Sequence, residues 1–353
     1  MNYQQIIKSI EKEVREFPKK VFRATEVLAG NPDYRVAKTP ADVVYTEDKM
    51  RLLHYHRRVK KKQIHKTPVL IVYALINRYI MLDLEPGRSF IQNLLNEGLD
   101  VYLIDWGYPT GADRYLDLND YINAYMDTGV DWIRSETKTK RINLMGVCMG
   151  GTFSVIYAAL HRKKVKNLIT LATPTQFDIH DAGLFLWARE FDVDEAVKEL
   201  GNLPGDLANI LYLLVTPVAT ATKYIQFLES IENPKFVSTF LRMEKWIFDS
   251  PDMAGEVFRE WIRDFLQQNQ LIQNRLILGG RKVDLRKIKC PLLNVFGKND
   301  YLAPPSTAKP LSRAVGSKDV TTIGIDTGHV GIFVGSRSYK TISPKIAKWI
   351  KER

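Results

Sequence analysis

The sequence of 353 residues contains only two cysteines, Cys148 and Cys290. Two cysteines are too few for a disulfide framework or for a cysteine-bound zinc site. No histidine or acidic cluster has metal-ligand spacing, and no glycine-rich loop of the dinucleotide-binding or phosphate-binding type occurs. We therefore expect neither a metal nor a bound cofactor, and chemistry that is carried out by side chains alone.

Long hydrophobic runs are also missing. No stretch of 18 apolar residues occurs, so no membrane-spanning helix is predicted. The first twenty residues are polar and charged, without the apolar core of a signal peptide. Hydrophobic residues make up 45% and charged residues 26% of the chain, as in ordinary folded proteins. We expect a cytoplasmic protein.

Acidic residues are outnumbered by basic ones, 40 to 51, and the formal net charge is +11. The densest basic run, residues 57–66, is interpreted as a solvated hairpin loop. No zinc-finger, homeodomain or RNA-binding motif accompanies this charge, so nucleic acid is not expected as a partner. A substrate that bears phosphates, or an acidic protein partner, would be attracted by the same field.

Short apolar runs alternate with helical stretches along most of the chain. Continuous apolar runs of this length fit strands that are buried on both faces of a parallel sheet. The alternation predicts an α/β fold with a doubly wound, mostly parallel sheet, preceded by a strand pair around residues 43–58. The predicted buried strands are residues 68–74, 100–106, 141–147, 166–173, 290–297 and 319–325.

Two segments stand apart from this series. Residues 5–29 predict an amphipathic helix, whose apolar stripe would fit either core packing or docking of a partner. Residues 175–285 contain no strand run, and we interpret them as a mostly helical cap inserted into a core formed by residues 1–174 and 286–353. The alternative is that the insertion simply completes the core. The stripe consists of Ile6, Ile10, Val14, Phe17 and Val21.

The stretch NLMGVCMGG, residues 143–151, has the pattern of a nucleophile elbow, with cysteine where many hydrolases have serine. In such an elbow the nucleophile follows a strand directly and sits on a sharp turn into a helix, which requires small neighbours. Here a predicted strand precedes Cys148, glycines flank it and a helical stretch follows. Cys148 is therefore the candidate nucleophile, and Cys290, before a proline at a strand start, is expected to be buried and inert.

The same position supplies candidate oxyanion donors. The backbone N–H of Met149 lies at the predicted helix N-terminus, where the helix dipole also favours a thiolate. The second donor of such sites comes from the loop after an earlier strand, here residues 74–77. Within that loop we predict the backbone N–H of Ile76.

An acid and a histidine follow the nucleophile in the chain order typical of such elbows. Asp300 lies just past the predicted strand 290–297, and His329 just past the strand 319–325. Both would reach the carboxyl edge of the sheet, where Cys148 is presented. Asp326 is closer to His329 in sequence, but we assign it to the turn. The predicted triad is Cys148, Asp300 and His329.

Sulfur at this position favours a thioester substrate. A thiolate that attacks an oxygen ester or an amide makes a more reactive bond than the one it breaks, whereas attack on a thioester exchanges one thioester for another. The acyl group can then pass to an acceptor other than water. His329 would move the proton and Asp300 would hold the imidazole in the right tautomer.

At these residues the sequence resembles the catalytic subunit of class III polyhydroxyalkanoate synthases, members of the α/β-hydrolase superfamily. The similarity runs over nearly the whole chain. One position departs from the family pattern: many members have histidine directly after the triad aspartate, where this chain has Tyr301. The stretches that carry the resemblance include VYALINRYIMLDLEPGRS, DVYLIDWGYP, GVCMGGTFS, GNLPGDLAN, LRMEKWIFDSPDMAGEVFREWIRDF, KCPLLNVFGKND and TGHVGI.

The resemblance implies that Cys148 takes a 3-hydroxyacyl group from coenzyme A, with (R)-3-hydroxybutyryl-CoA as the expected donor, and passes it to a growing polyester. It also implies a homodimer through the cap around Trp246, a separate synthase subunit of unrelated sequence, and a place at the surface of polymer granules. The net positive charge of the chain would attract the phosphates of coenzyme A or the partner subunit.

Two other functions fit the same residues. A cysteine-dependent acyl-CoA thioesterase would use the same elbow and triad and would pass the acyl group to water. A non-catalytic granule-associated protein would keep the fold without the chemistry, although all three triad residue types are present.

Overall fold

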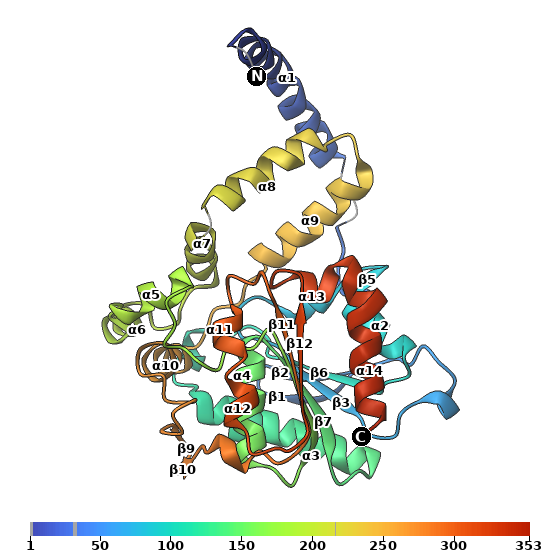
Figure 1. Cartoon of the computed structure of the whole chain (residues 1–353), viewed down its shortest axis with the longest axis vertical. Coiled ribbons are helices and arrows are strands. Elements are labelled where there is room, and N and C mark those ends of the chain that lie inside the picture. The colour runs from blue at the N-terminus through green and yellow to red at the C-terminus, as the bar shows by residue number, and fades with distance from the viewer. Residues whose placement is uncertain (1–2, 31–33, 216) are drawn as a thin grey trace.

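The computed structural model describes residues 3–30, 34–215 and 217–353 and is built around one eight-stranded sheet (Figure 1). The strand order is β1-β2-β6-β3-β7-β8-β11-β12. The first two pairings, β1 with β2 and β2 with β6, are antiparallel, and all others are parallel. The bounds are β1 Ala41–Glu47, β2 Met50–Tyr55, β3 Val69–Val72, β6 Val101–Asp105, β7 Ile142–Val147, β8 Val165–Leu171, β11 Leu292–Gly297 and β12 Val320–Ile325.

The central strands are buried along their whole length, as their apolar sequences predict. Every residue of β3, β6, β7 and β11 is buried, which requires cover on both faces of the sheet. The helix α4 packs on β3, β7 and β8, and α2 packs against α14. The predicted doubly wound α/β fold is confirmed. Its helices outside the insertion are α2 Phe90–Asn96, α3 Met126–Thr137, α4 Met149–Leu160, α11 Pro305–Ala308, α12 Leu311–Ala314, α13 Gly331–Val334 and α14 Ser343–Lys351.

Apart from a hairpin of two-residue strands, β9 Ile277–Leu278 and β10 Arg281–Lys282, the regular elements described between β8 and β11 are helices joined by loops. Several of its side chains, among them Phe177, Val257 and Phe265, belong to the same apolar cluster as the sheet. Part of the insertion therefore contributes side chains to the apolar core around the sheet, and the rest lies outside that core. Its helices are α5 Gly183–Arg189, α6 Val193–Leu200, α7 Gly205–Val215, α8 Pro217–Glu229, α9 Pro234–Phe248, α10 Gly255–Glu260 and a π-helical turn η5 Trp261–Gln267.

The N-terminal helix α1, Tyr3–Ala29, extends away from the sheet at the top of Figure 1 and meets α8 of the insertion. It contributes Ala24 to a second, small apolar cluster with α8 and α9. Three residues of the predicted stripe are not buried: Val14, Phe17 and Val21 are 67%, 47% and 39% exposed. Core packing is therefore the wrong explanation for these three residues. The side chains of Ile6 and Ile10 lie outside the described residues.

The basic run at residues 57–66 is solvated, but the prediction of a hairpin loop is wrong. It joins β2 to β3, and these strands are separated in the sheet by β6. The run therefore passes one end of β6 on its way from β2 to β3. Its lysine and arginine side chains are exposed.

Candidate active site

Cys148 sits between the last residue of β7 and the first residue of α4 with φ of 53° and ψ of −124°. A non-glycine residue in this region is strained, and such strain is characteristic of functional turns. The turn is close-packed: a Cβ on Gly150 would lie 2.3 Å from the carbonyl oxygen of Val72, and one on Gly146 would lie 2.3 Å from the Cα of Gly151. The glycines around Cys148 are thus required by the geometry of the elbow.

The loops after β11 and β12 bring Asp300 and His329 together. His329 Nδ1 lies 2.7 Å from Asp300 Oδ2, and Asp300 is only 3% exposed. The other carboxylate oxygen accepts hydrogen bonds from the backbone N–H groups of Leu302 and Ala303, both at 2.9 Å. The acid is therefore held in one orientation toward the imidazole.

Asp326, the acid nearest to His329 in sequence, points elsewhere. Its Oδ1 accepts a hydrogen bond from Asn299 Nδ2 at 3.1 Å, and this bond, together with the nearby guanidinium of Arg337, lowers the pKa of the Asp326 carboxyl. The structure thus places Asp300 against His329 and Asp326 at the surface.

The imidazole of His329 borders the same cavity as the sulfur of Cys148 and interacts electrostatically with it. Burial alone would lower the pKa of His329, but the charges of Cys148 and Asp300 and their hydrogen bonds outweigh burial and raise it from 6.5 to about 10. The structure therefore brings the three predicted triad residues together, and the environment of His329 favours the protonated imidazolium form of its ring.

The raised pKa of His329 gives a pH dependence that can be measured. We expect the ring resonances of His329 to titrate with a midpoint near 10, and Cys148→Ala to move that midpoint downward because the charge on the sulfur is removed. Since the folded-state pKa lies above the unfolded value of 6.5, the pairing stabilises the fold fully below about pH 6.5 and is lost as pH rises through about 10. Titration by NMR tests this; a midpoint near 6.5 in both proteins would contradict it.

The other cysteine, Cys290, has a different environment. Burial raises the pKa of its thiol to about 11, so it stays protonated at neutral pH. A protonated thiol is a poor nucleophile, which agrees with the inert role expected for Cys290.

The two predicted oxyanion donors border the same cavity as Cys148 and His329. Met149 is the first residue of α4, and the first N–H groups of a helix have no partner within it. Within the described part of the chain, neither the backbone N–H of Met149 nor that of Ile76 donates a hydrogen bond to a backbone carbonyl oxygen. Both are therefore free for a substrate oxygen.

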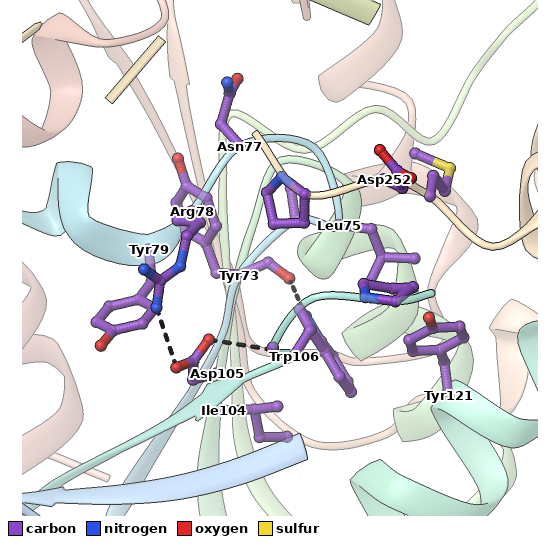
Figure 2. A pocket seen from close by; sticks show the side chains of 15 residues that line it. Tyr73, Leu75, Asn77, Arg78, Tyr79, Ile104, Asp105, Trp106, Tyr121 and Asp252 are labelled. Atoms are coloured by element: carbon purple, nitrogen blue, oxygen red, sulfur yellow. Dashed lines mark hydrogen bonds and ion pairs between the residues drawn. The ribbon is translucent and has the colours of Figure 1, made fainter. Parts of the chain in front are cut away.

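The loop after β3 that carries Ile76 is held by a network that the sequence did not reveal (Figure 2). Trp106 Nε1 donates to the carbonyl oxygen of Tyr73 at 3.0 Å, and Arg78 donates to Asp105 Oδ2 at 3.2 Å. In Figure 2 these side chains line a small pocket beside the loop, and Tyr73, Ala74 and Asn77 border both this pocket and the Cys148 cavity.

The helix α9 is attached to the same loop. Trp246 Nε1 donates to the carbonyl oxygen of Arg78, and Asn77 Nδ2 donates to that of Ile247, both at 3.0 Å. Asn77 itself has a left-handed backbone with φ of 57°, which asparagine tolerates better than most residues. The insertion is therefore fixed directly to the loop that carries the candidate oxyanion donor.

The cavity around Cys148 measures about 300 Å³ and lies between the sheet and the insertion. Its walls are mostly apolar, and Tyr301, the residue that departs from the family pattern, is also at its border. Trp246 lines this cavity, although the family resemblance implies that it contacts a second copy of the chain. The insertion side contributes Leu184, Phe185, Tyr212, Leu213, Met243 and Trp246.

In residues 3–30, 34–215 and 217–353, no group of three histidine, cysteine or acidic residues could hold a metal ion. Across these same stretches no helix has the length and apolarity to cross a bilayer.

Comparison with known proteins identifies the class from the fold. A model of the alpha/beta hydrolase fold matches residues 67–336. Among solved structures, a putative lipase from Sulfolobus solfataricus superposes with a TM-score of 0.57, with 15% identity over 91% of this chain and 99% of that one. An esterase from Thermogutta terrifontis gives 0.52, with 17% identity over 90% and 99%. At these identities the likeness shows the fold alone: an α/β-hydrolase fold.

Sequence comparison is more specific. A model described as the N-terminus of poly-beta-hydroxybutyrate polymerase (PhaC) matches residues 10–94. A protein of Allochromatium vinosum named poly(3-hydroxyalkanoate) polymerase subunit PhaC is 43% identical over 98% of this chain and 97% of its own length. One of the same name from Synechocystis is 40% identical over 97% and 92%. The chain belongs to the poly(3-hydroxyalkanoate) polymerase family, which confirms the resemblance.

Proposed function

We propose that the chain is a polyester synthase that transfers 3-hydroxyacyl groups from 3-hydroxyacyl-CoA, with (R)-3-hydroxybutyryl-CoA as the expected donor, onto a growing polyhydroxyalkanoate. The acyl group is carried as a thioester on Cys148. One observation supports this most strongly: a cysteine at the elbow shares an apolar cavity with a His329–Asp300 pair, in a chain of this family.

Acylation begins with attack of the Cys148 sulfur on the thioester carbonyl. The carbonyl oxygen becomes an oxyanion, which the backbone N–H groups of Met149 and Ile76 stabilise. When the intermediate collapses, the carbon–sulfur bond to coenzyme A breaks, and the coenzyme A sulfur takes the proton from His329. Coenzyme A leaves as the free thiol, and the acyl group remains on Cys148.

Elongation uses the same residues, but His329 now accepts a proton where it donated one during acylation. The neutral His329 accepts the proton of a 3-hydroxyl group, and the resulting oxygen attacks the acyl thioester on Cys148. An ester bond forms, the bond to the Cys148 sulfur breaks, and the thiolate returns beside the imidazolium. Asp300 holds the ring in the tautomer that both steps need. This route uses no cofactor other than the substrate's own coenzyme A.

The cavity favours transfer over hydrolysis. Apolar side chains of the insertion, such as Leu184, Phe185 and Met243, line it together with Cys148. A lining of this kind limits the access of water to the acyl thioester. The 3-hydroxyl group of a bound acyl unit is then the better-placed acceptor.

The partners form part of the same proposal. They are 3-hydroxyacyl-CoA, a second copy of the chain through the insertion, a separate synthase subunit and the surface of a cytoplasmic polymer granule. Exposed apolar side chains on α1 and α8 support protein or polymer contacts there: Val14 is 67% exposed, Val218 78% and Ile225 53%.

Incubation of the purified chain with (R)-3-hydroxybutyryl-CoA tests the function. We expect release of coenzyme A together with an insoluble polyester, measured by a thiol assay and by gas chromatography of the methanolysed pellet. Release of coenzyme A with free 3-hydroxybutyrate in solution and no polymer would instead make the chain a thioesterase.

A further inference from the structure

The cavity around Cys148 contains a buried amide with no partner. Asn209 on α7 is 3% exposed and lines the cavity. Its Nδ2 is closed to solvent and makes no hydrogen bond within the described part of the chain. A buried donor left without an acceptor costs about 1–3 kcal/mol, so a free amide at a functional site calls for a ligand.

The orientation of this amide follows from its neighbour. Asn77 Nδ2 donates to the carbonyl oxygen of Ile247 at 3.0 Å and to Asn209 Oδ1 at 3.3 Å. Both contacts are donations, so the Asn209 atom that faces Asn77 must be the oxygen. The Asn209 NH₂ group therefore points away from Asn77, and neither of its protons has a partner within the described part of the chain.

Asn209 on α7 borders the same cavity as the Cys148 sulfur. Tyr212, one helical turn further along, borders the same cavity, and the charge of Cys148 contributes, after burial, to raising the pKa of its phenol. Residues three apart lie on the same face of a helix. Asn209 and Tyr212 thus face the same space as the acyl group that Cys148 would carry.

Three other polar side chains that the insertion contributes to this cavity, those of Lys223, Thr220 and Trp246, already have partners. Lys223 Nζ donates to Glu244 at 2.7 Å, Thr220 Oγ1 to the carbonyl oxygen of Leu213 at 3.3 Å, and Trp246 Nε1 to that of Arg78 at 3.0 Å. An apolar pocket discriminates poorly between an acyl chain and its hydroxylated analogue, whereas a site with a positioned hydrogen-bonding group does so strongly. The free amide of Asn209 is such a group.

We propose that Asn209 Nδ2 donates a hydrogen bond to the oxygen on carbon 3 of the acyl group held by Cys148, and that Asn209 thereby selects 3-hydroxyacyl over unsubstituted acyl donors. This inference rests on the proposed function. The oxygen is a hydroxyl in a single unit and an ester oxygen within the polymer, and it can accept a hydrogen bond in both forms.

The test compares two donors that differ only in this oxygen, 3-hydroxybutyryl-CoA and butyryl-CoA. Coenzyme A release is measured with the enzyme in excess over the donor, and the ratio of the two rates is the readout. We expect Asn209→Leu, which removes the amide, to lower that ratio about tenfold, as for the loss of one hydrogen bond. Asn209→Ala, which also removes the amide and adds no bulk, should lower the ratio of the two rates as well.

Thr220→Val is the matched control. It removes a polar group that the insertion contributes to the same cavity, changes the side-chain size little and leaves the Asn77–Asn209 pair intact. We expect this variant to retain the ratio of the two rates. Equal loss of rate with both donors in the Asn209 variants, an unchanged ratio in those variants, or the same change of ratio in Thr220→Val would overturn the inference. Absence of coenzyme A release from both donors with the unmodified chain would overturn the proposed function instead.

Discussion

Replacement of Cys148 by alanine is expected to reduce coenzyme A release from 3-hydroxybutyryl-CoA by at least about 10⁴-fold, because no other group can form the acyl thioester. Alanine keeps a Cβ at the strained elbow and adds no atoms to a close-packed turn. The variant should therefore fold. Steady-state thiol assays and thermal unfolding of both proteins measure the two parts of this expectation.

Cys290→Ala is the control for the loss of a thiol as such. Cys290 borders the apolar core, and its thiol stays protonated at neutral pH, so this variant should retain full coenzyme A release. Substantial activity in Cys148→Ala, or a comparable loss in Cys290→Ala, would remove Cys148 from the mechanism.

Asp300→Asn is expected to lower the rate of coenzyme A release about 10³- to 10⁴-fold. The asparagine oxygen can still accept from the backbone of Leu302 and Ala303. Its amide nitrogen would then face His329 Nδ1 and donate to it, which fixes the imidazole in the tautomer that cannot accept a proton from Cys148 or from a 3-hydroxyl group. Stopped-flow or single-turnover assays at neutral pH give the rate.

Asp326→Asn is the matched variant at the neighbouring acid. Asp326 is exposed and bonded to Asn299, so we expect its removal to change the rate less than about twofold. If Asp326→Asn were the damaging variant and Asp300→Asn the harmless one, the choice between the two acids would be reversed.

The elbow and the strands could be predicted because local sequence determines them. A run such as residues 141–147 is apolar apart from Arg141 and Asn143, and in the structure β7 covers Ile142–Val147 with every residue buried. Strands buried on both faces leave little ambiguity in the pattern. The order of strand, Cys148, glycines and helix then fixes the place of the nucleophile, and the loops after β11 and β12 place Asp300 and His329 at the same edge.

Contacts across the insertion could not be predicted. Asn77 and Asn209 are 132 positions apart, and nothing in the apolar pattern of α7 shows which of its faces would meet the cavity. The stripe on α1 illustrates the same limit: its periodicity correctly predicted a helix, but Val14 and Phe17 are exposed. Periodicity identifies an apolar face and leaves open what that face meets.

A covalent acyl thioester at Cys148 is the central intermediate of the proposed reaction. Mass spectrometry of a peptide digest, after brief reaction with 3-hydroxybutyryl-CoA and acid quenching, tests this. We expect the peptide that contains Cys148 to gain the mass of one or more 3-hydroxybutyryl units, and the gain to disappear on treatment with neutral hydroxylamine. Coenzyme A release with an unmodified Cys148 peptide at every time sampled, or with the acyl group on another residue, would contradict the account.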